Sequence, residues 1–444
     1  MINSPWIDNL DRKFTSSELV ENKKTEIVIV GGGISGVLTA FNILKSTNKH
    51  LILIESNRVG HGASGHNAGM MIAYVENINE VVNHEQYSKE RITNTLKRLD
   101  DSWTEFHNIR KLIPEIDNYF TQVEGHSGYE DKYSILENMT KSQNMKKWGM
   151  NLQEEFYISS EIELESDNYD FKVVSQSEVD NKFPEAKNKF IGYSLLSNLG
   201  VMNSAQFVQD LLHYLSTSYK DRFEVFDKSP LKEIVNLEDK NICEINDHYI
   251  EAKNVIICTN GYKIPNIVGR DNFEEVSIQG VVNYMMGAVV SDDVKPSAYT
   301  YYKKVDTQEN GESAVEGDVD YVYGTSRKMK NKTLLTFGNS SDDLVDGEIY
   351  LSERQIDEAR LSELRTQAKS YFDFINSETP EYLWHGLMGY TNSRNRKLGE
   401  FPKGSGLIYN IGCNGIGIMP AIASGKLIGE YFQNGRFEDT IWNV

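Results

Sequence analysis

Residues 31–56 read GGGISGVLTAFNILKSTNKHLILIES, and this stretch decides the fold of the first part of the chain. The β-branched run 27–30, just before the glycines, is typical of a strand buried on both faces. After the glycines, apolar residues recur at steps of three and four, which predicts a helix. The apolar run 51–54 predicts a second strand. We therefore interpret the stretch as a strand, helix and strand unit.

The glycines of this stretch have the spacing of a dinucleotide-binding turn. Gly31 permits the tight turn, Gly33 lets a pyrophosphate approach the backbone, and Gly36 lets the helix pack closely. The N-terminus of a helix attracts phosphate, and Glu55 ends the second strand, where a carboxylate accepts hydrogen bonds from ribose hydroxyls. A chance glycine-rich loop is the alternative, and the flanking strands and helix argue against it.

Length and charge bound the class of protein. The chain has 444 residues, with 46 Lys and Arg against 65 Asp and Glu, so its net charge of −19 opposes binding to nucleic acid and to anionic membranes. The length predicts two domains, with three as the alternative. We find no apolar run of transmembrane length and no signal-like N-terminus, so we expect a cytoplasmic protein without integral membrane contact. The three cysteines and nine histidines lack metal-ligand spacing, so no metal site is predicted.

A second glycine loop lies near the C-terminus. The strand-like run 407–411 leads into Gly412, Gly415 and Gly417, and a helix is expected to start near Pro420. Two glycine-bounded helix N-termini suit an extended ligand whose phosphates meet one and whose redox ring meets the other. The alternative is that the second loop only lets the helix pack on its sheet. Between the loops, residues 276–340 alternate apolar and polar positions, which predicts an antiparallel sheet and a second domain.

Seven stretches, in order along the chain, resemble the FAD-dependent D-amino acid oxidase superfamily, which holds glycine oxidase, sarcosine oxidase and dimethylglycine dehydrogenase. The stretches are IVIVGGGISG, LIESNRVGHGASGHNAG, VMNSAQFVQDLL, AKNVIICTNGY, KTLLTFGN, WHGLMGYT and GLIYNIGCNGIGIMPAIASGKLIGEYF. SGHNAG and CTNGY look most like the gamma-glutamylputrescine oxidase type of amine oxidase.

The resemblance implies an α/β fold, with a Rossmann-like FAD-binding domain and an interleaved α+β substrate domain built on an antiparallel sheet. The expected FAD-binding domain is discontinuous and comprises residues 1–82, 170–270 and 375–444. The expected substrate-binding or cap domain comprises residues 83–169 and 271–374.

The resemblance also assigns residues to each part of FAD. The glycine turn and helix start would hold the pyrophosphate, and the end of the second strand would hold the adenosine. The GASGHNAG loop would lie at the flavin ring, and CTNGY would flank the adenosine half. GCNGIGIM would lie at the pyrimidine edge of the flavin, where amide groups stabilise negative charge. In that order, the expected FAD-binding residues are Gly31, Gly33, Ile34, Ser35 and Gly36; Glu55, Ser56 and Arg58; Ser64, His66, Asn67, Ala68 and Gly69; Thr259 and Gly261; and Gly415, Ile416, Gly417 and Ile418.

His66 has two interpretations. Dimethylglycine and sarcosine dehydrogenases carry FAD covalently on a histidine at the matching place in this loop, so the resemblance implies the same attachment here. The alternative is a histidine that packs or hydrogen-bonds at the edge of the flavin.

On the substrate side, the expected catalytic residues are Arg327, His66 and Tyr284. Glycine and D-amino acid oxidases hold the substrate carboxylate with an arginine, and Arg327 is the nearest match; an ordinary solvated arginine is the alternative. A second family pattern, Trp-x-Gly-x-Arg-Pro, is altered because Met388 replaces the arginine and Ser393 the acid that follows. Tyr284, with Tyr323 and Tyr390, would shape an apolar cavity, or else belong to the core.

These features predict an enzyme that oxidises a C–N bond of a small amine or amino acid to an imine, with hydride transfer to flavin N5 and hydrolysis afterwards. Met388 favours an amine, or an amino acid whose carboxylate lies far from the oxidised carbon. Electrons would pass to oxygen or to another acceptor. The alternatives are an FAD-dependent tRNA-modifying enzyme, which the negative charge opposes, a non-catalytic flavin-binding subunit, and a plain NAD dehydrogenase.

Overall fold

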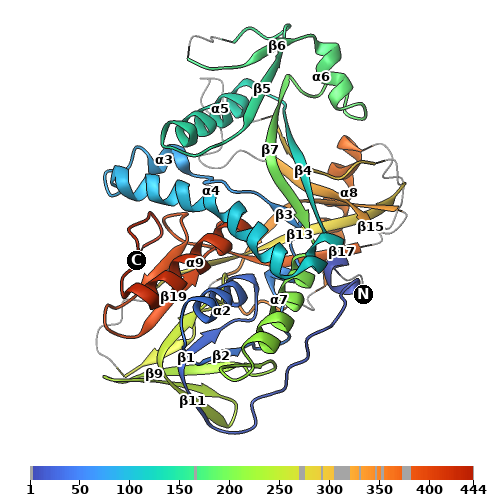
Figure 1. The fold of residues 1–444 in the computed structure, drawn as a ribbon. Helices are drawn as coiled ribbons and strands as arrows, with labels where there is room; N and C mark the ends of the chain where they lie inside the picture. The colour runs from blue at the N-terminus through green and yellow to red at the C-terminus, as the bar shows by residue number, and fades with distance from the viewer. Residues whose placement is uncertain are drawn as a thin grey trace.

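A computed structural model describes residues 4–164, 168–269, 276–291, 294–304, 321–329, 332–345, 348–351, 355–372 and 382–443. Within these residues the chain forms two β-sheets with helices packed around them, and both sheets take strands from distant parts of the sequence (Figure 1).

The first sheet contains the predicted strand, helix and strand unit. Its order is β12-β9-β10-β11-β1-β2-β8, and β19 pairs with β11 and with β18. β1 runs parallel to β2 and to β11, and β11 runs parallel to β19, so the glycine loops that follow β1 and β19 lie at the same edge of the sheet. The bounds are Lys23–Val30 (β1), Leu51–Ile54 (β2), Phe223–Phe226 (β8), Leu231–Asn236 (β9), Asn241–Ile245 (β10), His248–Ile257 (β11), Asn266–Val268 (β12), Lys397–Glu400 (β18) and Leu407–Ile411 (β19).

Helices α2 (Ile34–Ser46), α9 (Ile418–Asn434) and α7 (Ser204–Ser218) gather on one face of this sheet, as Figure 1 shows. The helices predicted after both glycine loops are therefore confirmed. α9 packs directly on α2, because Gly425 and Gly429 carry no side chain where a Cβ would lie about 3 Å from the backbone of α2. This packing joins the two ends of the chain into one unit.

The second sheet has the order β17-β13-β16-β15-β14-β4-β7-β5-β6, and β3 pairs with β7. The antiparallel sheet predicted from residues 276–340 is confirmed by the pairing of β13 with β16, β16 with β15 and β15 with β14. The bounds are Met70–Met71 (β3), Phe120–Tyr129 (β4), Glu154–Ser159 (β5), Lys172–Val174 (β6), Gly192–Met202 (β7), Gln279–Val290 (β13), Ser297–Tyr302 (β14), Tyr321–Met329 (β15), Lys332–Asp343 (β16) and Tyr382–Tyr390 (β17).

The predicted domain boundaries stay a prediction. The boundaries at 270–271 and 374–375 lie outside the described residues. β7 and β17 fall within the segments expected to bind FAD, yet both pair in the second sheet. Adjacent stretches of the chain enter different sheets, so the chain passes between the two sheets more often than the sequence indicated.

Among the remaining helices, α8 packs on β13 and β16, α5 on β4, α6 on β5, and α4 on α9. No helix in the described part of the chain is long and apolar enough to cross a membrane. The bounds are Pro5–Asp8 (α1), Ile78–Val81 (α3), Lys89–Leu112 (α4), Lys132–Lys147 (α5), Gln176–Lys182 (α6) and Glu358–Tyr371 (α8), with short 3₁₀ turns at Ala63–Gly65 (η1) and Pro114–Asn118 (η2).

Candidate active site

A cavity of about 570 Å³ is lined by residues of both sheets and by both glycine loops. This volume is in the range of pockets that enclose small molecules and cofactors. The lining includes the turn after β1, the end of β2, the loop 61–69, the loop after β11 and the loop after β19. The cavity thus brings together five segments that are far apart in the sequence.

The two helices that begin at this cavity lack side-chain caps. The N-terminal residues Gly33 of α2 and Gly417 of α9 have no side chain to accept a hydrogen bond from the first turn. The other long helices do have such caps, from Ser88 in α4, Asp131 in α5 and Asn203 in α7. Apart from the Ile34 amide, which donates to the Ser64 hydroxyl, the amides at these helix starts need another acceptor, and an anion is one that can serve.

The first turn is shaped so that only backbone faces the cavity. Gly31 has φ +109°, a left-handed conformation that favours glycine, and a Cβ there would lie 2.7 Å from the carbonyl oxygen of Cys258. A Cβ on Gly36 would lie 2.0 Å from the carbonyl oxygen of Gly31. Gly36 does not line the cavity, so its role is to let α2 pack against the turn, as the spacing predicted.

Glu55 organises the edge of this turn. Its Oε2 accepts a hydrogen bond from the Gly32 amide at 2.8 Å, and its Oε1 accepts from the Asn57 amide at 2.9 Å and from the Ser56 hydroxyl at 3.1 Å. Burial raises the pKa of the Glu55 carboxyl, and these hydrogen bonds oppose the rise. The carboxylate lines the cavity at the end of β2, where the sequence placed a ribose-binding acid.

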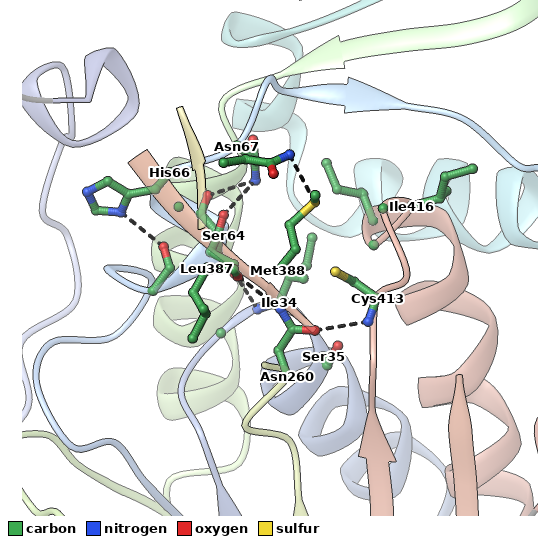
Figure 2. Close-up of a pocket in the computed structure, with 18 of the residues that line it drawn as sticks. Ile34, Ser35, Ser64, His66, Asn67, Asn260, Leu387, Met388, Cys413 and Ile416 are labelled. Atoms are coloured by element: carbon green, nitrogen blue, oxygen red, sulfur yellow. Dashed lines mark hydrogen bonds between the residues drawn. The ribbon is translucent and has the colours of Figure 1, made fainter. Parts of the chain in front are cut away.

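The loop 61–69 is held from three sides. The Ser64 hydroxyl accepts from the Ile34 amide at 2.9 Å, and the Asn67 amide group donates to the Ser204 hydroxyl at 2.8 Å. The Trp6 indole, from α1, donates to the Asn67 carbonyl. His66 Nδ1 lies 3.1 Å from the carbonyl oxygen of Gly62, and Figure 2 shows its ring pointing away from Met388 and Cys413. The loop is therefore fixed relative to α1, α2 and α7.

The loop after β11 connects the other walls. Asn260 donates to the Leu387 carbonyl in β17 at 3.3 Å and accepts from the Cys413 amide at 3.0 Å, as Figure 2 shows. The Thr259 hydroxyl oxygen lines the cavity, is buried and has no hydrogen-bond partner in the described part of the protein. A buried hydroxyl without a partner indicates a place for a polar ligand atom.

Arg396, which the sequence reasoning missed, lies between the two helix starts. Its guanidinium donates to the Asn410 side-chain oxygen at 2.7 Å, to the Ser35 hydroxyl at 3.4 Å and to the Gly417 carbonyl at 3.5 Å. Burial lowers its pKa to about 10, so it stays charged at neutral pH. A buried cation beside two uncapped helix N-termini adds to the preference for an anion.

Strand parity decides which residues of β13 face the cavity. Asn283 and Met285 line it, whereas Tyr284 lies between them and points to the opposite face, where its hydroxyl donates to Asp342 at 2.8 Å. The prediction that Tyr284 contacts substrate therefore placed the residue on the wrong face of the strand. Met388 does line the cavity, and its sulfur lies 3.7 Å from the Asn283 side-chain amide.

Arg327 does not line the cavity either. It lies on the same face of β15 as Tyr321 and Tyr323, but near the far end of the strand, and its guanidinium stacks 5.2 Å from the centre of the Trp6 ring. Burial lowers its pKa to about 10. The expected carboxylate clamp is thus not present at this position, because α1 covers the end of β15.

Sixteen of the expected FAD-binding residues line the cavity. The exceptions are Gly36, the exposed Arg58 and Gly261, where a Cβ would lie 2.2 Å from the Met388 carbonyl and so block contact with β17. The residues that line it are Gly31, Gly33, Ile34, Ser35, Glu55, Ser56, Ser64, His66, Asn67, Ala68, Gly69, Thr259, Gly415, Ile416, Gly417 and Ile418.

The fold is similar to that of several solved structures. Glycine oxidase from Geobacillus kaustophilus superposes with a TM-score of 0.67 at 15% identity, over 95% of this chain and 98% of that chain. L-proline dehydrogenase from P. horikoshii superposes with a TM-score of 0.63 at 13% identity, over 95% of this chain and 97% of that chain. The reduced L-alpha-glycerophosphate oxidase from Mycoplasma pneumoniae, solved with FAD bound, gives 0.64 at 12% identity, over 95% and 99%. At these identities the likeness shows the fold alone.

The sequence comparison gives the family. A search of curated proteins finds no significant match. The family profile described as DAO, FAD dependent oxidoreductase, matches residues 26–431, which is nearly the whole chain. The glycine cradle, the uncapped helix starts and Glu55 suit the dinucleotide that this family uses. The chain therefore belongs to the DAO family of FAD dependent oxidoreductases.

Proposed function

We propose that the protein oxidises a C–N bond of a small amine, or of an amino acid whose carboxylate lies far from the oxidised carbon. The proposal is supported by the side chains that face the cavity from β13, β15 and β17. These are Asn283, Met285, Tyr323, Met388 and their neighbours, and none of them is a cation that would hold an α-carboxylate. Among the described lining residues, arginine and lysine occur only as Arg396 and Lys263, which lie beside the helix starts and the loop after β11.

The first part of the machinery would hold FAD. The Ser35 amide at the start of α2, next to the Ile34 amide that donates to Ser64, would hold the pyrophosphate together with the Arg396 guanidinium. Glu55 would accept hydrogen bonds from the ribose of adenosine. The start of α9, after Gly415 and Gly417, would face the flavin. When bound, FAD supplies a hydride acceptor at N5.

The second part would orient the amine and keep water away. Met285 and Met388 offer polarisable apolar surface that adapts to an alkyl chain. Asn283 donates to the Tyr323 hydroxyl at 3.2 Å, and its own side-chain oxygen is buried without a partner among the described residues. That oxygen is an acceptor for an amine N–H, which would hold the nitrogen while its carbon is oxidised.

The test is anaerobic mixing of the purified yellow protein with small primary and secondary amines, α-amino acids and glycerol phosphate. We expect amines to bleach the flavin absorption band fastest, with a rate that rises with pH because the amine must lose its proton. Bleaching only by glycerol phosphate or only by α-amino acids would overturn the substrate class. A protein that binds FAD but is bleached by no compound would instead fit a non-catalytic flavin subunit.

Covalent attachment of FAD to His66 stays a prediction. His66 lines the cavity, and its Nδ1 lies beside the Gly62 carbonyl. Denaturing the protein in acid decides between the alternatives. A yellow precipitate that turns colourless in His66→Ala supports attachment, and a yellow supernatant from the unmodified protein excludes it.

A further inference from the structure

The cavity continues beyond the proposed flavin site along one face of the second sheet. Tyr323 in β15 is paired with Thr300 in β14, and Thr300 with Ser127 in β4, and all three residues line the cavity. In the next row of the sheet, Leu196 in β7 is paired with Glu154 in β5, and both also line it. Four strand spacings of about 4.8 Å separate β15 from β5, so this arm extends roughly 19 Å along the sheet.

Glu154 lies at the far end of this arm, which we call the distal arm. Its Oε1 accepts a hydrogen bond from the Ser194 hydroxyl at 3.0 Å, whereas its buried Oε2 makes no hydrogen bond of good geometry with the described residues, although the Ser142 hydroxyl lies close enough to lower the pKa of the carboxyl. Burial raises the pKa of its carboxyl to about 7, and neighbouring hydroxyls only partly oppose the rise. A carboxylate kept from water with one oxygen unsatisfied is costly unless it receives a partner.

Tyrosines accompany Glu154 in the distal arm. The cavity is lined there by Tyr74, Tyr302 and Tyr321. The centre of the Tyr302 ring lies 5.1 Å from the centre of the Tyr129 ring and 5.7 Å from that of Tyr321. Burial holds the pKa values of Tyr74 and Tyr302 well above the ordinary value, with the nearby acids adding to the effect, so both phenols stay neutral. Aromatic faces beside a carboxylate are the surroundings that stabilise an organic cation.

The described charged groups around Glu154 form no ion pair with its carboxylate. Glu76 also lines the distal arm, but its Oε1 already pairs with Lys141 Nζ at 2.6 Å. Lys146 Nζ donates to the backbone carbonyl of Glu154 at 2.9 Å on the exposed side, so its charge lowers the pKa of the carboxyl only as the weakest of the opposing effects. Among the described residues that line the distal arm, no cation forms an ion pair with Glu154.

We propose that the distal arm binds a second positive charge of the substrate, with Glu154 as its counterion. The substrate class is then an elongated amine with two cationic groups: one nitrogen beside the oxidised carbon, and a second ammonium held at Glu154. This inference rests on the proposed function and adds the chemistry of the far end of the substrate. Glu154 is a binding residue in this scheme and takes no part in the transfer of hydride.

The experiment compares straight-chain diamines of increasing length with monoamines of the same carbon number, in the wild-type holoenzyme and in Glu154→Gln. Anaerobic flavin reduction gives an apparent Kd and a limiting rate for each amine. We expect Glu154→Gln to raise the Kd of the best diamine roughly 10- to 100-fold, because an ionic hydrogen bond is lost. The monoamine Kd and the limiting rates should change less than about twofold. Glu155→Gln is the matched control, since Glu155 is exposed on the opposite face of β5.

A second measurement separates this inference from the proposed function. A bis(trimethylammonium) alkane has no nitrogen lone pair and forms no imine, so calorimetric titration with it reports binding without turnover. We expect wild-type holoenzyme to bind it more tightly than the singly charged analogue, with a preference that declines as pH falls below about 7 and Glu154 is protonated. Equal binding of both cations at pH 8, or no loss of diamine affinity in Glu154→Gln, would overturn the role of Glu154. Failure of every amine to reduce the flavin, with calorimetric preference intact, would overturn only the proposed reaction.

Discussion

The cavity has two halves with walls of different construction, a cofactor half that we propose holds FAD and a substrate half that we propose holds the amine. In the cofactor half, backbone amides at the starts of α2 and α9 face the cavity, and glycines keep side chains out of the way. In the substrate half, side chains of the second sheet form the wall, and the alternation of each strand decides which ones point inward. A site built from backbone amides can be seen in the sequence as a characteristic spacing of glycines. A site built on a sheet face shows only the alternation of apolar and polar residues that every such strand has.

The largest expected effect comes from breaking the cofactor half at Gly36. In Gly36→Ala the new Cβ would lie 2.0 Å from the Gly31 carbonyl, so the start of α2 must move away from the turn. We expect loss of FAD binding and a destabilisation of about 3 kcal/mol from overpacking. Flavin content per protein and the thermal unfolding midpoint measure both effects. The exposed Lys45→Ala, on the same helix, is the control, and a variant at Gly36 that keeps stoichiometric FAD would contradict the packing argument.

This difference explains how much the sequence predicted. The runs 27–30 and 51–54 became β1 and β2, and the helix expected after the second glycine loop begins at Ile418, two residues before Pro420. The cofactor half was predictable because turn geometry demands particular residues at particular spacings. Its one large omission, Arg396, stands in a polar loop with no motif, and only the tertiary fold brings it to Ser35 and Gly417.

The substrate half was not predictable from the same signals. Tyr284 and Asn283 are neighbours on β13, and a one-residue difference in register exchanges the residue that lines the cavity for one in the core. Arg327 is covered by Trp6 of α1, a contact between residues far apart in sequence. Glu154 reads as an ordinary charged residue next to Glu155, and only the pairing of β5 with β7 turns it inward.

A second way to test the cofactor half is to remove the charge of Arg396. Arg396→Met keeps most of the side-chain volume but leaves the two helix starts without their buried cation. We expect FAD affinity to fall by roughly 10- to 100-fold, as for the loss of an ionic hydrogen bond. Titration of apoprotein with FAD, followed by flavin fluorescence, measures the change. Arg394→Met, at an exposed position of the same loop, is the control. An unchanged affinity would mean that Arg396 serves only to hold Asn410 and the Gly417 carbonyl.

The substrate half can be sharpened at Met388, the position where the family pattern has arginine. Met388→Arg places a guanidinium beside Asn283 in the cavity wall. We expect KM for α-amino acids to fall about tenfold through a charge-assisted pair with the carboxylate, and amine turnover to decrease because the cation repels a charged amine. Steady-state kinetics with alanine-like and alkylamine substrates measures both. Met388→Leu keeps the wall apolar and should show no gain with amino acids. If amine turnover falls but the KM for α-amino acids does not, the carboxylate of a bound amino acid lies elsewhere in the cavity.

The same carboxylate that we propose binds the second cation also changes the stability of the protein. Because folding raises the pKa of Glu154 from 4.5 to about 7, the folded state binds a proton more tightly than the unfolded state does. The folded state therefore loses stability as pH rises from about 4.5 to 7, by on the order of 1–3 kcal/mol in the absence of a bound cation. Glu154→Gln removes this loss, so we expect the variant to melt at a higher temperature than wild type at pH 8 and at a similar temperature near pH 4.5. Glu155→Gln, which alters an exposed carboxylate, should follow the wild-type pH profile.

If the difference between Glu154→Gln and wild type did not grow with pH, the Glu154 carboxylate would already be compensated, and the distal arm would have no need of a cation. If the difference grows with pH and a saturating diamine abolishes it, the unpaired carboxylate destabilises the folded protein and the bound ligand removes that destabilisation.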